Sequence, residues 1–382
     1  MIHLRLAQAT KPRAVKFKAV KFKAVKFKIA ALRRPLRYLR SSACLLILSL
    51  FALSLCAACS TLALFSPNPS NSGTLATVLS RGHVICGVDG QHPGFSFQSP
   101  DGEYSGLDAD YCRAIASALF DDPSKVEFKR VAQGVFTDLL DGTVDILLRD
   151  TPWTIARDAA IDFVTPIFYD GQGLLASVNL DTTSFDSFKD KTICVRAGTP
   201  AEATLKAFFK KARIPINAVA LDGDNELFIN FANGNCEIVT ANRSDLAIRR
   251  QTLTNPQQYQ LLKLTLSQEP IAPIVRVNES KWLDVVKWII YGTFRAEELG
   301  VSKKNVMALS PHPDPQIRRF LGVEGAYGTD LSIPNDFMRR VIHHVGNYAE
   351  IYQRNIGSPF QLPRGVNELW VNGGLICPMP FR

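Results

Sequence analysis

From Thr74 onward the chain alternates between two hydrophobic periods, and this pattern predicts strands and helices in turn. Short apolar runs are typical of buried strands, and apolar residues that return every three or four positions are typical of one face of a helix. We expect strands at 83–88, 126–131, 144–148, 193–195, 218–221 and 236–240. We expect helices at 108–120, 135–140, 201–211, 225–232, 245–252, 281–299 and 336–355. Two successive strand–helix–strand sets predict an α/β fold with parallel strands, in which ligands bind at the carboxyl ends of the strands.

The segment before this pattern follows neither period. Residues 1–40 form a basic low-complexity arm with the repeat AVKFK three times in succession. Residues 41–65 carry no charge and include LCAAC at 55–59. This run looks like the lipobox of a bacterial secretory signal, with Cys59 as the residue that would be lipidated. An uncleaved membrane anchor is the alternative, because a spanning helix needs about 20 apolar residues. Residues 66–74 form a Pro/Ser/Asn-rich linker.

The net charge of +9 comes entirely from the basic arm. The arm has 13 Lys or Arg and no Asp or Glu, so residues 41–382 carry 31 basic and 35 acidic side chains. This acidic body has no phosphate-binding glycine loop, and we expect no nucleic-acid partner. A basic flank before an apolar segment predicts export, with the body outside the cytoplasm and tethered to the inner membrane.

Several motifs of the body resemble one family. GLDADYCRAIA, DGTVDILLRDTPWTIARD, YDGQG and ICVRAGTPAE resemble the extracytoplasmic amino-acid-binding proteins of ABC transporters, which are solute-binding protein family 3. AEELGV, VGNYAEIYQRNIG and GVNELWVNGGL resemble its general L-amino-acid-binding branch. The resemblance implies a type II periplasmic-binding-protein fold and an ABC permease as partner. It implies two lobes, 75–170 with 275–382 and 171–274, each with a central sheet flanked by helices. Two hinge strands near 169–174 and 271–276 would join them.

Five cysteines lie beyond the apolar segment. None forms a CxxC pair or lies near a His at metal-ligand spacing, so we expect no metal, and we expect no cofactor. In an exported protein disulfides are the default, and four cysteines allow three connectivities. The lobes implied by the resemblance favour Cys86–Cys112 and Cys194–Cys236, which leaves Cys377 free. Buried free thiols are the alternative.

The resemblance also implies a ligand site. Arg157 stands where the family places the arginine that binds the ligand carboxylate, and a guanidinium can bind a carboxylate with two parallel hydrogen bonds. Thr151 and Thr199 would add donors to the same group, although helix capping explains Thr199 as well. Asp89 and His92 follow the first strand, in the loop that usually lines the side-chain pocket; His92 fits an exposed loop residue equally well.

Four positions depart from the family pattern. Pro152 and Pro200 replace residues that offer an N–H, which proline lacks. Asn242 stands where the family has an Asp that pairs the ligand ammonium, and Asp150 stands where this branch usually has Asn. Either Asp150 or Asp89 now pairs the ammonium, or the ligand is not a standard α-amino acid. The expected ligand is an amino acid or a related small zwitterion.

Two other functional classes compete with a transport receptor. A degenerate cleft would suit a sensor or interaction module. The same fold is used by exported dehydratases of prephenate-like acids, for which His92, Asp150 and Asp89 would be the acid–base candidates. No Ser-His-Asp or Cys-His pattern supports catalysis, so we do not expect an enzyme.

Overall fold

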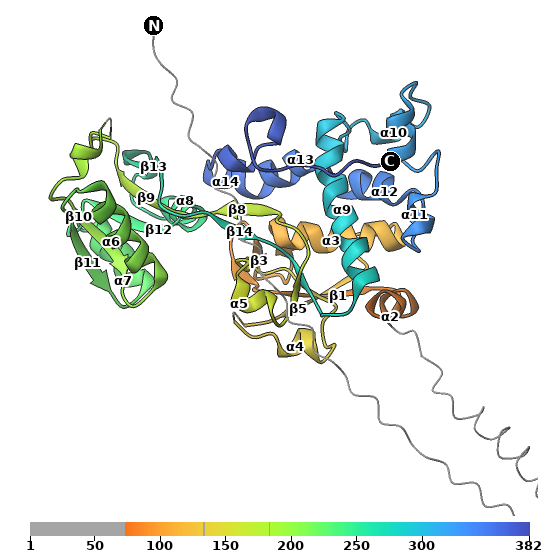
Figure 1. Ribbon diagram of the computed structural model, residues 1–382, viewed down its shortest axis with the longest axis horizontal. Coiled ribbons are helices and arrows are strands. Elements are labelled where there is room, and N and C mark those ends of the chain that lie inside the picture. The colour runs from red at the N-terminus through yellow and green to blue at the C-terminus, as the bar shows by residue number, and fades with distance from the viewer. Residues whose placement is uncertain (1–72, 133, 183) are drawn as a thin grey trace, which may run out of the picture. The chain divides into compact units, whose positions relative to one another are not determined.

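A computed structural model describes residues 73–132, 134–182 and 184–382 of the chain. The basic arm, the expected signal or anchor with Cys59, and most of the linker lie outside these residues. Within them, no helix is both long and apolar enough to cross a membrane. The described chain contains two central sheets, which define a first and a second lobe (Figure 1).

The first lobe is built on a five-stranded sheet in which β1 pairs in parallel with β5 and β6, while β15 lies antiparallel between β6 and β7. Its strands are β5 (Val126–Arg130), β1 (Val84–Val88), β6 (Ile146–Leu147), β15 (Ile274–Val275) and β7 (Asp162–Phe163). The helices α3 (Leu107–Phe120), α9 (Ser280–Glu298) and α12 (Phe337–His344) pack on one another, and α3 contacts β1. Both ends of the described chain therefore contribute to one core.

The second lobe has its own five-stranded sheet, in the order β11, β10, β12, β9 and β13. The strands are β11 (Asn217–Leu221), β10 (Thr192–Arg196), β12 (Ile238–Asn242), β9 (Gln172–Ser177) and β13 (Tyr259–Thr265). The helices are α6 (Pro200–Ala212), α7 (Asp224–Ala232) and α8 (Arg243–Arg250). The expected α/β fold is confirmed, but the sheets are mixed, because β9 and β13 run antiparallel to their neighbours.

The chain passes between the lobes through a pair of antiparallel strands, β8 (Phe168–Asp170) and β14 (Glu269–Ile271) (Figure 1). Gly171 connects β8 to β9, and a Cβ atom at this position would lie 2.0 Å from the Ser267 carbonyl oxygen. Only glycine permits so close an approach of two backbones. The second crossing ends where the expected hinge range 271–276 begins, and residues 274–275 belong to the first sheet as β15.

One expected helix is wrong. The pattern at 336–355 predicts a single helix, but the structure has α12, α13 (Tyr348–Tyr352) and a π-helix at Gln353–Gly357. Gly346 has a φ of 103°, which ends helical geometry, and Asn347 begins α13 in a capping box with Glu350. The sequence also missed a three-stranded sheet after β1, made of β2 (Gln91–His92), β3 (Ser96–Gln98) and β4 (Tyr104–Ser105).

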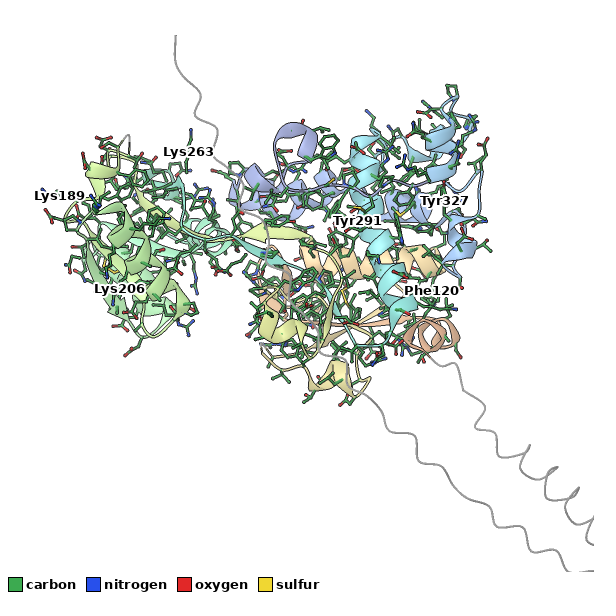
Figure 2. The ribbon with its side chains drawn as sticks, viewed as in Figure 1. Phe120, Lys189, Lys206, Lys263, Tyr291 and Tyr327 are labelled. Carbon is green, nitrogen blue, oxygen red and sulfur yellow. A yellow bond between two sulfur atoms is a disulfide. The ribbon has the colours of Figure 1, made fainter. Side chains whose placement is uncertain are left out.

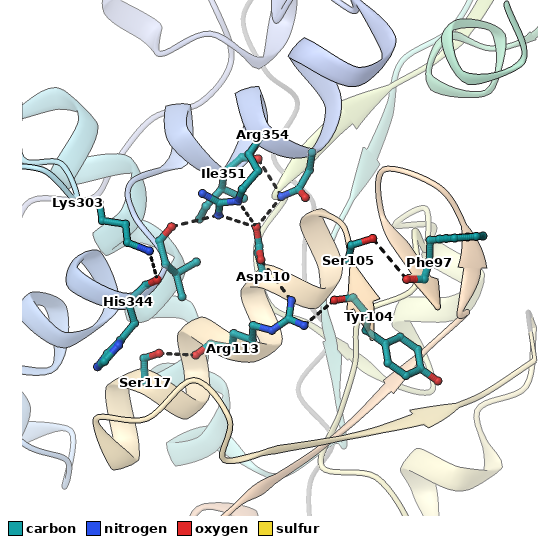
Figure 3. A network of polar contacts seen from close by, with 12 residues as sticks. Phe97, Tyr104, Ser105, Asp110, Arg113, Ser117, Lys303, His344, Ile351 and Arg354 are labelled. Carbon is teal, nitrogen blue, oxygen red and sulfur yellow. Dashed lines mark hydrogen bonds and ion pairs between the residues drawn. The ribbon is translucent and has the colours of Figure 1, made fainter. Parts of the chain in front are cut away.

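A polar network attaches the π-helix to α3 (Figure 3). Asp110, in the first turn of α3, accepts hydrogen bonds from Arg354 Nε at 3.0 Å and from Asn355 Nδ2 at 2.6 Å. On the other side, Arg113 lies 3.5 Å from Asp110 and donates to the Tyr104 carbonyl of β4. The network therefore fixes the end of α3 that faces the loop after β1.

Both expected disulfides are confirmed, and the alternative of buried free thiols is wrong for these four residues. Cys86 in β1 is bonded to Cys112 in α3, with Cα atoms 6.1 Å apart. Cys194 in β10 is bonded to Cys236, just before β12, with Cα atoms 5.7 Å apart. Cys377 is free and exposed. Each bond joins a helix or loop to the sheet of its own lobe and leaves the crossing strands without a covalent link.

Figure 2 labels three lysines of the second lobe and three aromatic residues of the first. The labelled lysines are exposed on the second lobe, whereas the labelled aromatic residues pack half-buried at the edge of the first core. They are Lys189, Lys206 and Lys263, and Phe120, Tyr291 and Tyr327. The three lysines come from different segments of the second lobe, since Lys206 lies in α6 and Lys263 in β13.

Candidate functional site

A cavity of about 510 Å³ lies between the lobes. From the first lobe it is lined by Asp89, Gln91, His92, Pro93, Asp150 and Pro152. From the second lobe it is lined by Asn242, Asp245, Ile248, Arg249 and Thr252. These residues follow β1 and β6 in one lobe, and β12 in the other, so the cavity lies at the carboxyl ends of parallel strands. It brings together four of the expected site residues: Asp89, His92, Asp150 and Asn242.

His92 contacts both lobes. Its Nδ1 lies 3.4 Å from Asp150 Oδ2, and its Nε2 lies 3.2 Å from Asp245 Oδ1 on α8. The Nε2 contact has ion-pair distance but not the alignment of a hydrogen bond. Burial lowers the pKa of His92, but the neighbouring Asp245 and Asp150 outweigh it and raise this pKa to about 9. The imidazole is therefore a cation at neutral pH that connects two carboxylates across the cavity.

Asp150 has an unusual backbone conformation, with a φ of 51°. Asn and Asp adopt this left-handed region more readily than other side-chain-bearing residues, so the exchange of the expected Asn for Asp preserves the backbone. Its N–H donates to Asp108 Oδ2 at 3.1 Å. Burial, together with Asp170, Asp245 and Glu269, raises the pKa of Asp150 to about 7, although His92 lowers it. The carboxylate thus gains from any further cation that enters the cavity.

Two more carboxyl groups lie near Asp150. Asp108 is buried in the first turn of α3, and burial, with the charge of Asp150, raises its pKa to about 8. Asp170 is buried at the end of β8, and burial raises its pKa to about 6 even though it accepts hydrogen bonds from Ser244 and Gly171. At the cavity itself the three carboxyl groups of Asp89, Asp150 and Asp245 outnumber the two cationic groups of His92 and Arg249, so the site favours a positively charged ligand group.

Three expected site residues do not line this cavity. Arg157 is half-buried in α5 (Ile155–Asp158) and donates to the Pro152 carbonyl at 2.7 Å. Thr151 is buried without reaching the cavity, and the Thr199 hydroxyl donates to the Arg196 carbonyl at the start of α6. Their roles at the ligand carboxylate stay predictions.

Two charged residues of the cavity, Asp245 and Arg249, were missed by the sequence analysis. Asp245 lies in the first turn of α8, where an acidic residue is already explained by the helix dipole, so nothing marked it as a ligand residue. Arg249 lies one turn later, with its guanidinium 5.5 Å above the Phe228 ring and 3.4 Å from Asn225. Trp153, close to the expected site residues in sequence, stacks on Phe163 in the first lobe and does not line the cavity.

Known proteins are similar to this chain in sequence and in fold. The model of the bacterial extracellular solute-binding proteins, family 3, matches residues 84–299. The general L-amino acid-binding periplasmic protein AapJ of Rhizobium johnstonii is 39% identical over 320 residues, which are 82% of this chain and 94% of AapJ. The glutamate/glutamine/aspartate/asparagine-binding protein BztA of Rhodobacter capsulatus is 38% identical over 319 residues, again 82% of this chain and 94% of the relative.

A solved structure of a periplasmic binding protein is also similar to this chain. It is an ABC transporter periplasmic binding protein from Brucella ovis with glutathione bound, and it is 38% identical to this chain. The two superpose with a TM-score of 0.71, over 81% of this chain and 99% of the other. The resemblance stated from the motifs and the type II fold are thereby confirmed. This chain belongs to the bacterial extracellular solute-binding proteins of family 3.

Proposed function

We propose that this protein captures a small ligand with a free α-ammonium and α-carboxylate group between its lobes and delivers it to an ABC permease for import. The observation that carries this proposal is the group of carboxylates, Asp89, Asp150 and Asp245, around one interlobe cavity. An ammonium buried there needs a negative partner, because an unpaired buried charge is very costly.

The ligand class follows from what the relatives are named for. AapJ is named for general L-amino acids, BztA for glutamate, glutamine, aspartate and asparagine, and the Brucella ovis protein holds glutathione. All of these ligands carry an α-ammonium beside an α-carboxylate, since glutathione is linked through the side chain of its glutamate. The ligand proposed here shares this zwitterionic group.

Arg157 is the proposed partner of the ligand carboxylate. It lies in the first lobe, on the segment between Asp150 and β7, and uses one nitrogen on the Pro152 carbonyl. A guanidinium has five N–H donors, so this bond leaves several for a carboxylate. Rotation of the second lobe about β8 and β14 would close the cavity over the ligand.

The proposed function places the protein outside the cytoplasm. In this proposal the chain is exported, and the segment at 41–65 serves as signal peptide, lipoprotein signal or membrane anchor. The body then works on the periplasmic side of the inner membrane.

Calorimetric titration of the purified protein with the twenty L-amino acids and glutathione tests the proposal. We expect at least one to bind, and a ligand at 100 times its dissociation constant should add about 2.7 kcal/mol of stability. Arg157→Ala should weaken that binding at least tenfold. The matched control is Arg319→Ala, since Arg319 is similarly half-buried but lies on α10 (Pro315–Phe320), away from the cavity. Absence of heat and of thermal shift with every one of these ligands would refute the proposal.

A further inference from the structure

We infer that Asp245 supplies the second-lobe carboxylate for the ligand ammonium, and that His92 occupies this ammonium site as an internal substitute when no ligand is bound. The inference rests on the proposed function and assigns the residues that select the cationic end of the ligand. The family pattern places no carboxylate at the position of Asp245. His92 would compete with the ligand for this site.

The position of Asp245 explains the departure at Asn242. Asn242 ends β12 and begins α8, and its neutral side chain cannot balance an ammonium charge. Asp245 lies three residues later, and residues three apart lie on the same face of a helix. Both side chains line the cavity. The second-lobe carboxylate has therefore moved by about one helical turn without leaving the site.

The contacts of His92 are those of a ligand cation. Its two ring nitrogens lie 3.4 Å and 3.2 Å from carboxylate oxygens of Asp150 and Asp245, one on each lobe. The ring is held in place against Phe95, with centroids 4.7 Å apart. The His92 side chain is 20% exposed and that of Asp150 is 14% exposed, so this pair is only weakly screened by solvent, whereas the Asp245 side chain is 46% exposed and is screened more. A protein cation thus connects the two carboxylates that would otherwise repel each other.

The other charged groups at the cavity do not replace this cation. Arg249 is the only other cationic side chain that lines the cavity among the described residues, and its guanidinium is packed over Phe228 and directed toward Asn225. The remaining titratable groups that face His92 are carboxyl groups: Asp89, Asp108, Asp150 and Asp245. An arriving ammonium must therefore displace the imidazolium to reach both carboxylates.

This displacement predicts opposite effects for two substitutions. Asp245→Asn removes a charged partner of the ammonium and should weaken binding about tenfold or more. His92→Gln keeps a polar side chain but removes the imidazolium that competes with the ligand ammonium. Because the ligand then no longer has to displace this cation, binding should tighten at least threefold. A histidine that contacts the ligand directly would give the reverse result for His92→Gln.

The experiment measures dissociation constants of the purified full-length protein by calorimetry, with L-glutamine, L-glutamate and glutathione as probes. The variants are Asp245→Asn, Asp245→Ser, His92→Gln, and Asp245→Asn combined with Asn242→Asp. The double variant restores a carboxylate at the strand end and should bind within about threefold of the unchanged protein. Asp224→Asn is the control, because Asp224 is an exposed second-lobe carboxylate paired with Arg196 outside the cavity.

The outcomes separate the inference from the proposed function. Binding by the unchanged protein, weakened by Asp245→Asn and strengthened by His92→Gln, supports the inference. Binding that both Asp245 variants leave within twofold, or that His92→Gln weakens, overturns the inference and leaves the proposed function intact. No binding of any probe by the unchanged protein overturns both. A melting temperature for each variant within a few degrees of the unchanged protein shows that the variants fold.

Discussion

Asn367 binds both backbone groups of Tyr169 across 198 residues of sequence. Its Oδ1 accepts from the Tyr169 N–H at 2.6 Å, and its Nδ2 donates to the Tyr169 carbonyl at 2.9 Å. Tyr169 is the middle residue of β8, and its partner in β14 is Pro270, which has no N–H to donate. The Pro270 carbonyl instead accepts from the Trp153 N–H at 2.8 Å. The amide of Asn367 therefore satisfies both backbone groups of Tyr169, and it connects the C-terminal segment to the crossing strands.

Asn367→Ala should lower the free energy of unfolding by roughly 2 kcal/mol, since it removes two buried hydrogen bonds and leaves two backbone groups without these partners. Urea denaturation of the ligand-free protein measures the change. Asn372→Ala is the control, because Asn372 is exposed nearby in sequence, and it should change stability by less than about 0.5 kcal/mol. Equal stability of the Asn367 variant would show that water replaces the amide without cost.

Asp110→Asn should detach the π-helix from α3. The substitution removes the charge that Arg354 and Asn355 bind and places an NH₂ group among donors, which should cost about 2 kcal/mol given the partial exposure of Arg354. Hydrogen exchange at 353–360 should accelerate more than exchange in β10 or β12 of the second lobe. Asp186→Asn, at an exposed carboxylate, should leave both rates unchanged. Uniform acceleration in both lobes would contradict a local role.

Removal of either disulfide should destabilise its own lobe. The bonds close segments of 26 and 42 residues, for which the chain-entropy model gives roughly 3 to 4 kcal/mol each. Paired Cys→Ser variants, unfolded in urea, measure this loss, and Cys377→Ser is the control. Peptide mapping without reduction should link Cys86 to Cys112 and Cys194 to Cys236. A bridge to Cys377 would contradict the pairing.

Stability of the ligand-free protein should fall as pH rises from about 6.5 to 9. The pKa of His92 is raised in the folded protein to about 9, so its stabilising contribution is complete below the unfolded value of 6.5 and is lost as pH rises through 9. The raised pKa values of Asp108 and Asp150 act in the same direction, because both groups lose stabilising protons as pH rises. Urea denaturation across this range should show a loss on the order of 2 kcal/mol.

His92→Gln separates the contributions to this pH dependence. The loss of stability near pH 9, which belongs to His92, should disappear, whereas the loss near pH 7 to 8, which belongs to Asp150 and Asp108, should remain. The groups that face the imidazole from the packed elements are Asp89, Asp108, Asp150, Asp245 and Arg249. An unchanged slope near pH 9 would assign the titration there to another group.

Local patterns predicted six of the ten strands in the two central sheets of the described chain and most of the longer helices, because burial on one face imposes a period that the sequence displays. They could not predict the order of strands in the sheets, which depends on contacts between residues far apart. The break at Gly346 was missed because the hydrophobic period of 336–355 continues across it. The two disulfides were predictable because the implied lobes reduced three connectivities to one.

The candidate site was predictable only where the family resemblance supplied positions. One cavity is lined by four of the expected site residues, which are Asp89, His92, Asp150 and Asn242. An acidic residue in the first turn of a helix, such as Asp245, is explained by the helix dipole alone. Its contact with His92 is seen only in the structure, where α8 lies against the loop of His92. The left-handed backbone of Asp150 is likewise set by its surroundings rather than by its neighbours in sequence.

The position of β15 has a consequence for the order in which the lobes form. This strand lies inside the first sheet, between β6 and β7, yet it follows every strand of the second lobe in the chain. During synthesis and export the amino end emerges first, so the sheet of the first lobe stays open until residues 274–275 arrive. The second lobe, whose strands lie within 172–265, can complete its sheet earlier. The first lobe therefore completes its sheet after the second lobe, although its first strands are synthesised earlier. Until then its sheet has unpaired strand edges, which a chaperone could bind.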